Sequence, residues 1–352
     1  MDTDSGFAQR IVAWQRAHGR HDLPWQGTHD AYRIWLSEIM LQQTQVATVL
    51  PYYRRFCGEF PDVAALARAP LGRVLELWSG LGYYRRAHHL HAAARRVVER
   101  HGGRFPVDAA TLATLPGVGR STAAAIAAFA SGERAAILDG NVRRVLARQR
   151  GIEGWPGAPI LLAELWRVAE SLLPDTDVAT YTQALMDLGA TVCTRAHPRC
   201  GACPVATGCV ARRDGRVGEI PSPRPRKARP SRAVQALLLE RDGRTLLEQR
   251  APLGVWAGLW SLPELPLGGD VAAHVATRFG ATVAALQALP PVAHAFTHFR
   301  LTIHPVRVAI STWPPAMRTS GVEWFAHEAA LACALPAPIR KLIRSIATPI
   351  SV

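Results

Sequence analysis

The sequence predicts two folded domains, a mainly α-helical N-terminal domain and a smaller α+β C-terminal domain. Three observations carry this prediction. The length of 352 residues fits two domains of ordinary size. Apolar residues recur at helical spacing through residues 7–211, and from residue 233 the pattern changes to short alternating runs. The composition, 49% hydrophobic and 19% charged, excludes a disordered or collagen-like chain.

The elements follow from these patterns in order. Helices are expected at 7–18, 31–56, 71–77, 84–100, 121–130 and 161–172. The basic, proline-rich run 221–227 has too few apolar residues to join a core, so we expect a linker over 218–232 between domains at 1–217 and 233–352. In the second domain, 233–240 and 300–310 are expected strands, Asp242-Gly243 is an expected hairpin turn, and 271–279 is an expected helix.

The charge of the chain indicates a polyanionic partner. Lys and Arg total 41 against 27 Asp and Glu, a formal net charge of +14, which makes nucleic acid the leading candidate. The two lysines are Lys227 and Lys341, so the first 226 residues contain none. No apolar run is long enough to span a bilayer and the first residues lack a signal-peptide pattern, so we expect a cytoplasmic protein that binds no membrane.

Four of the six cysteines are crowded into seventeen residues in the spacing C-x6-C-x2-C-x5-C. They are Cys193, Cys200, Cys203 and Cys209. Four thiolates suit either a four-iron four-sulfur cluster or a structural zinc ion. A single C-x2-C between longer arms favours iron and sulfur, and zinc remains the alternative.

A glycine-containing segment, Leu115-Pro116-Gly117-Val118-Gly119, lies immediately before the expected helix at 121–130. Such glycines allow close backbone approach, and the amides at the start of the helix can hold a phosphate. The alternative is a tight turn between two helices. About twenty residues later, Asp139 lies at the N-terminus of another expected helix. It is either a simple N-cap or a catalytic carboxylate that the start of the helix holds in a fixed position.

Glu38 lies on a strongly apolar helical stretch beside Ile34, Trp35 and Leu41. A carboxyl group there is costly unless it is neutral or paired. Desolvation would raise its pKa and keep it protonated near neutral pH, as a general acid requires. The alternative is a salt-bridged core glutamate.

The hairpin, Asp139 and the cysteine loop together resemble the endonuclease III superfamily of helix-hairpin-helix DNA glycosylases over about residues 7–211. With the stretch Ser-Glu-Ile-Met-Leu-Gln-Gln-Thr-Gln at 37–45, the chain resembles the MutY adenine DNA glycosylase family. The resemblance implies a monomeric bacterial enzyme, bound to the nucleoid through DNA, that carries one 4Fe-4S cluster. Its substrate would be double-stranded DNA with adenine opposite 8-oxoguanine or guanine.

The resemblance also implies roles for individual residues. Glu38 would protonate adenine at N7, while Asp139, in an open and charged setting, would stabilise the sugar cation electrostatically or through a transient covalent bond. The residues implied in DNA contact are Gln43, Thr44, Tyr83, Gly117, Gly119, Ser121, Asn141 and Arg143. Those implied in the adenine pocket are Trp25, Leu41 and Gln183.

Ser121 occupies the position at which the lyase branch of the superfamily has a lysine after the hairpin. A hydroxyl cannot form the imine with the sugar that strand cleavage needs, and the lysine-free first 226 residues supply no substitute. We therefore expect base removal without strand cleavage.

Residues 233–345 resemble the Nudix-like domain with which MutY proteins recognise 8-oxoguanine. That role would fall to Phe296, Thr297 and His298. Thr277 and Arg278 stand where a Nudix hydrolase has paired glutamates, so we expect no nucleotide hydrolysis. Two other functions remain open: a related thymine glycosylase acting on G:T mismatches, and a non-enzymatic DNA-binding protein on the same scaffold.

Overall fold

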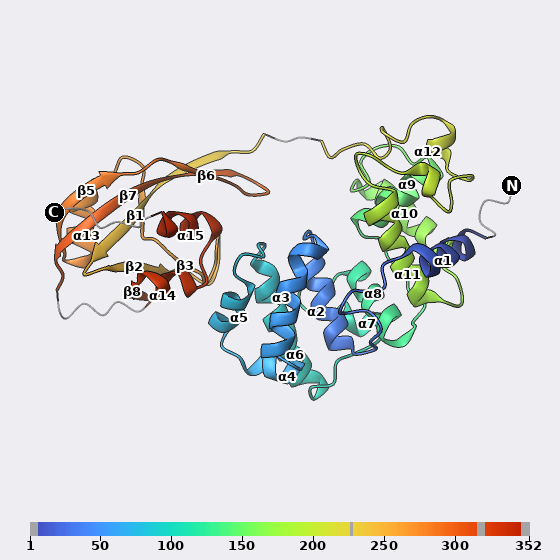
Figure 1. Ribbon diagram of the computed structural model, residues 1–352, viewed down its shortest axis with the longest axis horizontal. Coiled ribbons are helices and arrows are strands. Elements are labelled where there is room, and N and C mark those ends of the chain that lie inside the picture. Colours follow the sequence, from blue (N-terminus) through green and yellow to red (C-terminus); the bar gives the residue numbers. More distant parts are fainter. Residues whose placement is uncertain (1–5, 226–227, 315–320, 346–352) are drawn as a thin grey trace. The chain divides into compact units, whose positions relative to one another are not determined.

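The computed structural model describes residues 6–225, 228–314 and 321–345 (Figure 1). The chain forms two compact units. Unit 1 comprises Met1–Arg68 and His89–Arg226, and unit 2 comprises Ala69–His88 and Lys227–Val352. The predicted boundaries differ from this division, because they place residues 69–88 in the first domain. Residues 226 and 227 of the predicted linker lie outside the described residues.

Hydrogen bonds explain why residues 69–88 group with unit 2. The Tyr84 hydroxyl donates to the Leu335 carbonyl at 3.2 Å, and Arg340 Nη2 donates to Ser79 Oγ at 2.9 Å. These bonds join residues about 250 positions apart in the chain. Sequence periodicity reports only local structure, so it could not indicate this grouping.

Unit 1 is built from helices. Its α-helices are α1 (Phe7–His18), α2 (Ala31–Leu41), α3 (Val46–Glu59), α4 (Val63–Arg68), α7 (Ala109–Leu112), α8 (Arg120–Ser131), α9 (Gly140–Arg150), α10 (Pro159–Ser171), α11 (Val178–Asp187) and α12 (Val210–Arg213). A π-helical turn, η1 (Leu188–Val192), and a 3-10 turn, η2 (Cys200–Ala202), lead into the cysteine loop. Helix α6 (Arg85–His101) begins in the unit 2 segment and continues into unit 1.

The predicted helix at 31–56 is two helices in the structure. Asp30 caps α2 by accepting hydrogen bonds from the Tyr32 and Arg33 amides. The helix ends at Leu41 because Gln43 adopts the left-handed conformation, with φ of 59°, before α3 begins at Val46. Apolar spacing continues across this break, which is why periodicity alone joined the two helices.

Unit 2 contains α5 (Leu71–Trp78) and an eight-stranded sheet. The strands are β1 (Ser231–Arg241), β2 (Arg244–Gln249), β3 (Trp260–Ser261), β4 (Glu264–Pro266), β5 (Thr282–Ala288), β6 (Val292–Ala295), β7 (Arg300–Thr312) and β8 (Val322–Ala326). The order is β3-β2-β1-β7-β5, with β4 also on β1, β6 on β7 and β8 on β2. β1 and β7 are parallel, and the other pairs are antiparallel.

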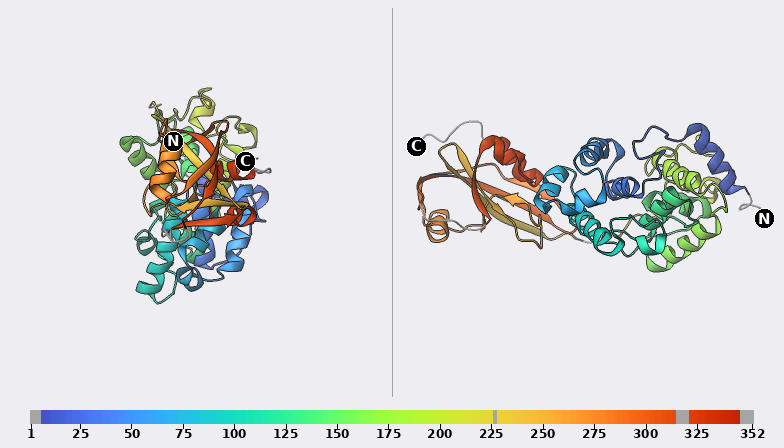
Figure 2. Two further views of the ribbon diagram at one scale, coloured as in Figure 1. Left: turned by 90° about the vertical axis from the view of Figure 1, so that its left-hand side faces the viewer. Right: turned by 90° about the horizontal axis from the view of Figure 1, so that it is seen from below.

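The remaining helices of unit 2 are α13 (Val271–Phe279), α14 (His327–Ala332) and α15 (Ala337–Arg344). The apolar residues of α13 pack on buried positions of β1 and β7, such as Leu237 and Val308, to form the core. The predicted turn at Asp242-Gly243 is present, with positive φ at both residues. Two further views show helices in the blue-to-green part of the chain and the strands in the yellow-to-red part (Figure 2). This confirms the predicted fold class, a mainly α-helical domain followed by a smaller α+β domain. No helix among the described residues is long and apolar enough to cross a membrane.

Candidate functional site

Glu38 lies on α2 between Ser37 and Ile39, both of which are buried. Its own side chain is partly buried. Burial, and after it the negative charge of Asp139, raise the pKa of Glu38 from 4.5 to about 8. Glu38 is therefore a neutral acid at neutral pH, and its proton is available for donation.

Asp139 is the N-cap of α9, and its Oδ1 accepts a hydrogen bond from the Val142 amide at 2.7 Å. We expected an open, charged setting, but the structure differs: burial raises the pKa of Asp139 above its ordinary value. Asp139 directly follows Ile137 and Leu138, which are buried in unit 1. The α9 amides and the charges of nearby arginines oppose the rise. These hydrogen bonds and charges favour the Asp139 anion, and that anion raises the pKa of Glu38, so of the two carboxyl groups Glu38 is the one that keeps its proton.

The hairpin before α8 is shaped by a glycine with no room for a side chain. Gly117 has φ of 78°, and a Cβ there would lie 2.8 Å from the Cβ of His89. Gln42 Nε2, just beyond α2, donates to the Gly117 carbonyl at 3.2 Å. Gly119 caps α8 without a side-chain hydrogen bond, so the first amides of α8 are presented for an anion.

Three residues that we expected to contact DNA are engaged within unit 1. Ser121 Oγ accepts a hydrogen bond from the Leu138 amide at 2.9 Å, and Arg143 Nε donates to the Leu138 carbonyl at 3.2 Å. Asn141 Oδ1 accepts from Arg144 Nη2 at 2.8 Å. The sequence could not indicate the bond between Ser121 and Leu138 because these residues lie seventeen positions apart.

Two other predicted DNA contacts lie at exposed, strained positions. Gln43, with φ of 59°, is exposed beyond the end of α2, next to Thr44, whose amide donates to the Leu41 carbonyl at 3.2 Å. In unit 2, Tyr83 has φ of 51° and is 50% exposed. The buried Arg86 guanidinium lies 5.4 Å from its ring and donates to the Gly82 carbonyl, which fixes the Tyr83 loop.

The residues assigned to the adenine pocket have mixed surroundings. Trp25 is buried and packs edge-on against Tyr53 at 5.2 Å. Leu41 is the partly buried last residue of α2. Gln183 Nε2 donates to Asp187 Oδ1 at 2.8 Å, and the fully buried Asp187 also forms an ion pair with Arg20 at 2.6 Å. Gln183 is thus held by a hydrogen bond to Asp187, which the ion pair with Arg20 fixes in turn. The sequence does not indicate this ion pair, because Arg20 lies on a distant loop.

The four clustered cysteines line one small pocket, which also includes Arg148 and Arg212. None of the four forms a disulfide. The buried Arg148 places Nη1 3.4 Å from Cys193 Sγ and donates to the Thr194 carbonyl at 2.7 Å. Among the described residues, no group of three His, Cys, Asp or Glu side chains is arranged to hold one metal ion. The four cysteines therefore converge on one common space.

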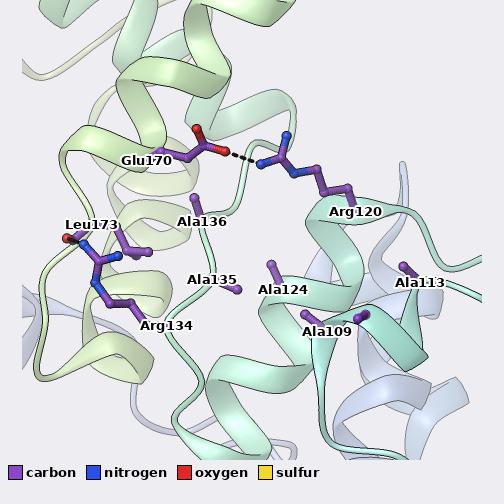
Figure 3. Close-up of a pocket in the computed structure, with 10 residues that line it drawn as sticks. Ala109, Ala113, Arg120, Ala124, Arg134, Ala135, Ala136, Glu170 and Leu173 are labelled. Atoms are coloured by element: carbon purple, nitrogen blue, oxygen red, sulfur yellow. Dashed lines mark hydrogen bonds and ion pairs between the residues drawn. The ribbon is translucent and has the colours of Figure 1, made fainter.

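A larger pocket, of about 410 Å³, lies beside α7, α8 and α10 (Figure 3). It is lined mainly by alanines, and neither Glu38 nor Asp139 lines it. Its two guanidinium groups are already paired, Arg120 with Glu170 and Arg134 with Asp175. This pocket therefore lacks the chemistry of the paired carboxylates.

The predicted recognition loop of unit 2 belongs to an aromatic cluster. The Phe296 ring stacks on Phe299 with centroids 4.4 Å apart, and it contacts Trp256 at 5.3 Å and His294 at 4.6 Å. Trp256 is buried and has φ of 57°, so a strained residue supports the loop. These contacts fix the chain on both sides of Thr297 and hold Phe296 in place.

Comparison with known proteins agrees with this geometry. A family model described as HhH-GPD superfamily base excision DNA repair protein matches residues 36–171, and one described as NUDIX domain matches residues 234–345. The fold and the site thus define a base-excision DNA repair protein of the helix-hairpin-helix class with a Nudix-type second domain.

The relatives define the family more closely. The chain is 33% identical over 341 residues to the adenine DNA glycosylase of Buchnera aphidicola subsp. Baizongia pistaciae, covering 97% of this chain and 96% of that protein. It is 33% identical over 403 residues to the adenine DNA glycosylase of Homo sapiens, covering 97% of this chain and 74% of that protein. The structure of a thermostable thymine-DNA glycosylase matches 60% of this chain and 98% of its own, with a TM-score of 0.55 and 29% identity. The chain belongs to the adenine DNA glycosylase family.

Proposed function

We propose that this protein hydrolyses the N-glycosidic bond of adenine mispaired with 8-oxoguanine or guanine in double-stranded DNA. The observation that carries the proposal is the carboxyl pair, in which burial and the Asp139 charge raise the pKa of Glu38 to about 8. A salt-bridged core glutamate would show the opposite shift, since a neighbouring cation lowers a carboxyl pKa.

The chemistry follows from where the proton resides. Adenine is flipped out of the duplex, Glu38 donates its proton to N7, and the C1′–N9 bond breaks with its electron pair going to the base, which leaves as neutral adenine. Ionised Asp139 stabilises the positive charge that develops on deoxyribose, electrostatically or through a transient bond, until water adds to C1′ and gives a proton back to the Glu38 carboxylate. Gln43 and Tyr83, exposed and strained, are suited to insertion at the mispair.

We further propose that the enzyme releases the base without cutting the strand. Ser121 follows the hairpin where an imine-forming lysine would be needed, and its oxygen accepts the Leu138 amide. The first 226 residues contain no lysine. Sodium borohydride should therefore trap little protein on DNA, and efficient trapping of a covalent adduct would contradict this part of the proposal.

The cysteine loop is proposed to hold one 4Fe-4S cluster through Cys193, Cys200, Cys203 and Cys209. Four thiols around one pocket, in a spacing that has a single C-x2-C between longer arms, support a cluster over zinc. The Arg148 guanidinium beside Cys193 Sγ offsets the negative charge that thiolates carry. The group would stabilise this loop, and visible absorbance with iron and sulfide analysis would separate it from zinc.

Recognition of the base opposite adenine is assigned to Phe296, Thr297 and His298 in unit 2. The Phe296 ring is held by its stack on Phe299 and by Trp256. Arg278, on α13, forms an ion pair with Glu248 at 2.5 Å. This pairing uses a cation where metal-dependent nucleotide hydrolysis needs acidic ligands, which supports recognition over hydrolysis. That the protein is a monomer acting on the bacterial chromosome in the cytoplasm remains a prediction.

The decisive experiment is single-turnover cleavage of labelled duplexes followed by alkali, with wild type and Glu38→Gln. Wild type should nick duplexes with A opposite 8-oxoguanine or G after alkali, and Glu38→Gln should be at least about a hundredfold slower. A G:T duplex tests the thymine alternative that the thermostable relative raises. Equal activity of the variant would refute the assigned acid, and binding without base release would support the non-enzymatic alternative.

A further inference from the structure

The segment that carries Asp139 has no regular structure of its own. Helix α8 ends at Ser131 and α9 begins at Gly140, and residues 133–139 form neither helix nor strand. Leu138, directly before Asp139, is fully buried. The position of the Asp139 carboxylate therefore depends on the contacts that hold this extended segment.

Side chains from two helices satisfy both backbone groups of Leu138. Ser121 Oγ, in the first turn of α8, accepts from the Leu138 N–H at 2.9 Å. Arg143 Nε, in the first turn of α9, donates to the Leu138 carbonyl at 3.2 Å. A buried peptide without a ladder partner needs such bonds, because an unpaired N–H or C=O in the interior is costly. The two peptide groups that flank Leu138 are thus each held by a side chain, one from α8 and one from α9.

We propose that Ser121 and Arg143 are positioning residues for Asp139, acting through the peptide groups of Leu138 rather than through contact with DNA. This rests on the proposed function, in which Asp139 faces the deoxyribose. The hydroxyl at residue 121 supplies an acceptor that alanine lacks and that a thiol provides only weakly. A shift of about 1 Å in a catalytic group can slow a reaction about a hundredfold, so loosening this clamp should reduce the rate of base release.

The first test compares Ser121→Ala, Ser121→Thr and Ser121→Cys in single-turnover adenine release at saturating enzyme, together with the Kd for the uncleaved duplex. The Ala and Cys variants should be at least about tenfold slower with Kd within about twofold, and Thr should recover most of the rate. Ser131→Ala, which removes a hydroxyl at the other end of α8, is the matched control.

Two outcomes would overturn the proposal: an unchanged rate in Ala and Cys, or a weaker Kd with an unchanged rate at saturation, which would mean a DNA contact. If Ser121→Ala does not fold, the Thr and Cys variants decide, because equal rates would exclude the acceptor role. An inactive wild type would refute the proposed function instead.

A measurement that does not depend on activity separates these two failures. Hydrogen exchange of the Leu138 amide, followed in peptides covering residues 133–141, should be at least about tenfold faster in Ser121→Ala than in wild type or Ser131→Ala. Unchanged protection would overturn the clamp even in an inactive protein.

A double-mutant cycle then tests the shared route. Ser121→Ala and Arg143→Met should slow base release less in combination than the product of their single effects, because both loosen the backbone of the same residue, Leu138. Strictly multiplicative effects would show that the two residues act independently.

Discussion

The proton held on Glu38 should appear in the stability of the folded protein as well as in catalysis. Burial and the Asp139 charge together raise the pKa of Glu38 from 4.5 to about 8, so the folded chain keeps a proton that the unfolded chain releases over this interval. A carboxyl group with a raised folded pKa stabilises the fold least at high pH, since the folded state binds more protons and the free energy of unfolding falls as pH rises. Glu38→Gln removes this titration while keeping nearly the same shape.

The magnitude follows from the shift. Between about pH 5.5 and about pH 8, the Glu38 carboxyl should cost the wild type roughly 3 kcal/mol of unfolding free energy relative to Glu38→Gln. For a folded unit of about 200 residues, this corresponds to a change of roughly 6–12 °C in the difference between the two Tm values. The Tm of Glu38→Gln should therefore exceed the Tm of the wild type by more at about pH 8 than at about pH 5.5.

The assay is thermal unfolding by circular dichroism of wild type and Glu38→Gln at the two pH values and one ionic strength. Glu99→Gln on α6 is the matched control, because the Glu99 side chain is 62% exposed and the chemical change is the same. A Tm difference between wild type and Glu38→Gln that stays constant with pH would refute the raised pKa of Glu38. It would also refute the assignment of Glu38 as the proton donor.

Three further predictions concern the hairpin, the pH profile and unit 2. Single-turnover adenine release should fall about tenfold per pH unit above about 8, because ionised Glu38 cannot donate, and should also fall at acidic pH, because protonated Asp139 cannot stabilise the sugar cation; a flat profile to about pH 10 would contradict this. Gly117→Ala should lower stability by roughly 2 kcal/mol in denaturant titrations, owing to its φ of 78° and the His89 contact, while Gly119→Ala, whose Cβ meets nothing within 4 Å, should not; equal losses would count against the packing explanation. Phe296→Ala should reduce the rate preference for A opposite 8-oxoguanine over A opposite G at least about fivefold, and an unchanged ratio would exclude this loop from recognition.

Local patterns in the sequence predicted the elements well. The helices at Phe7–His18 and Val271–Phe279 have the predicted bounds, because each is bordered by glycine or by a capping aspartate. The four cysteines were predicted to converge, and they line one pocket, because a loop of seventeen residues leaves them little freedom to separate. Short-range spacing is thus sufficient where the structure is local.

Long-range contacts account for what the sequence did not reveal. The sequence places Gln183 in the base pocket, which stays a prediction, but it does not indicate that Gln183 donates to Asp187, which pairs with Arg20 across 167 positions of the chain. Ser121 was assigned to DNA, yet its oxygen holds the Leu138 amide. Side-chain partners of this kind depend on how helices pack, and no periodicity in one segment specifies the residues of another.

The burial of Asp139 changes how the two carboxyl groups divide their work. We expected one dry, neutral acid and one open, charged one, but burial raises the pKa of both groups. What distinguishes them is hydrogen bonding: Asp139 accepts from the start of α9 and lies near the charges of Arg143 and Arg144, so its anion is the more stable. That anion in turn raises the pKa of Glu38. Proton donation by Glu38 therefore depends on the Asp139 anion. Any change that displaces Asp139, including loss of the hydrogen bonds that hold Leu138, should weaken proton donation as well as stabilisation of the sugar cation.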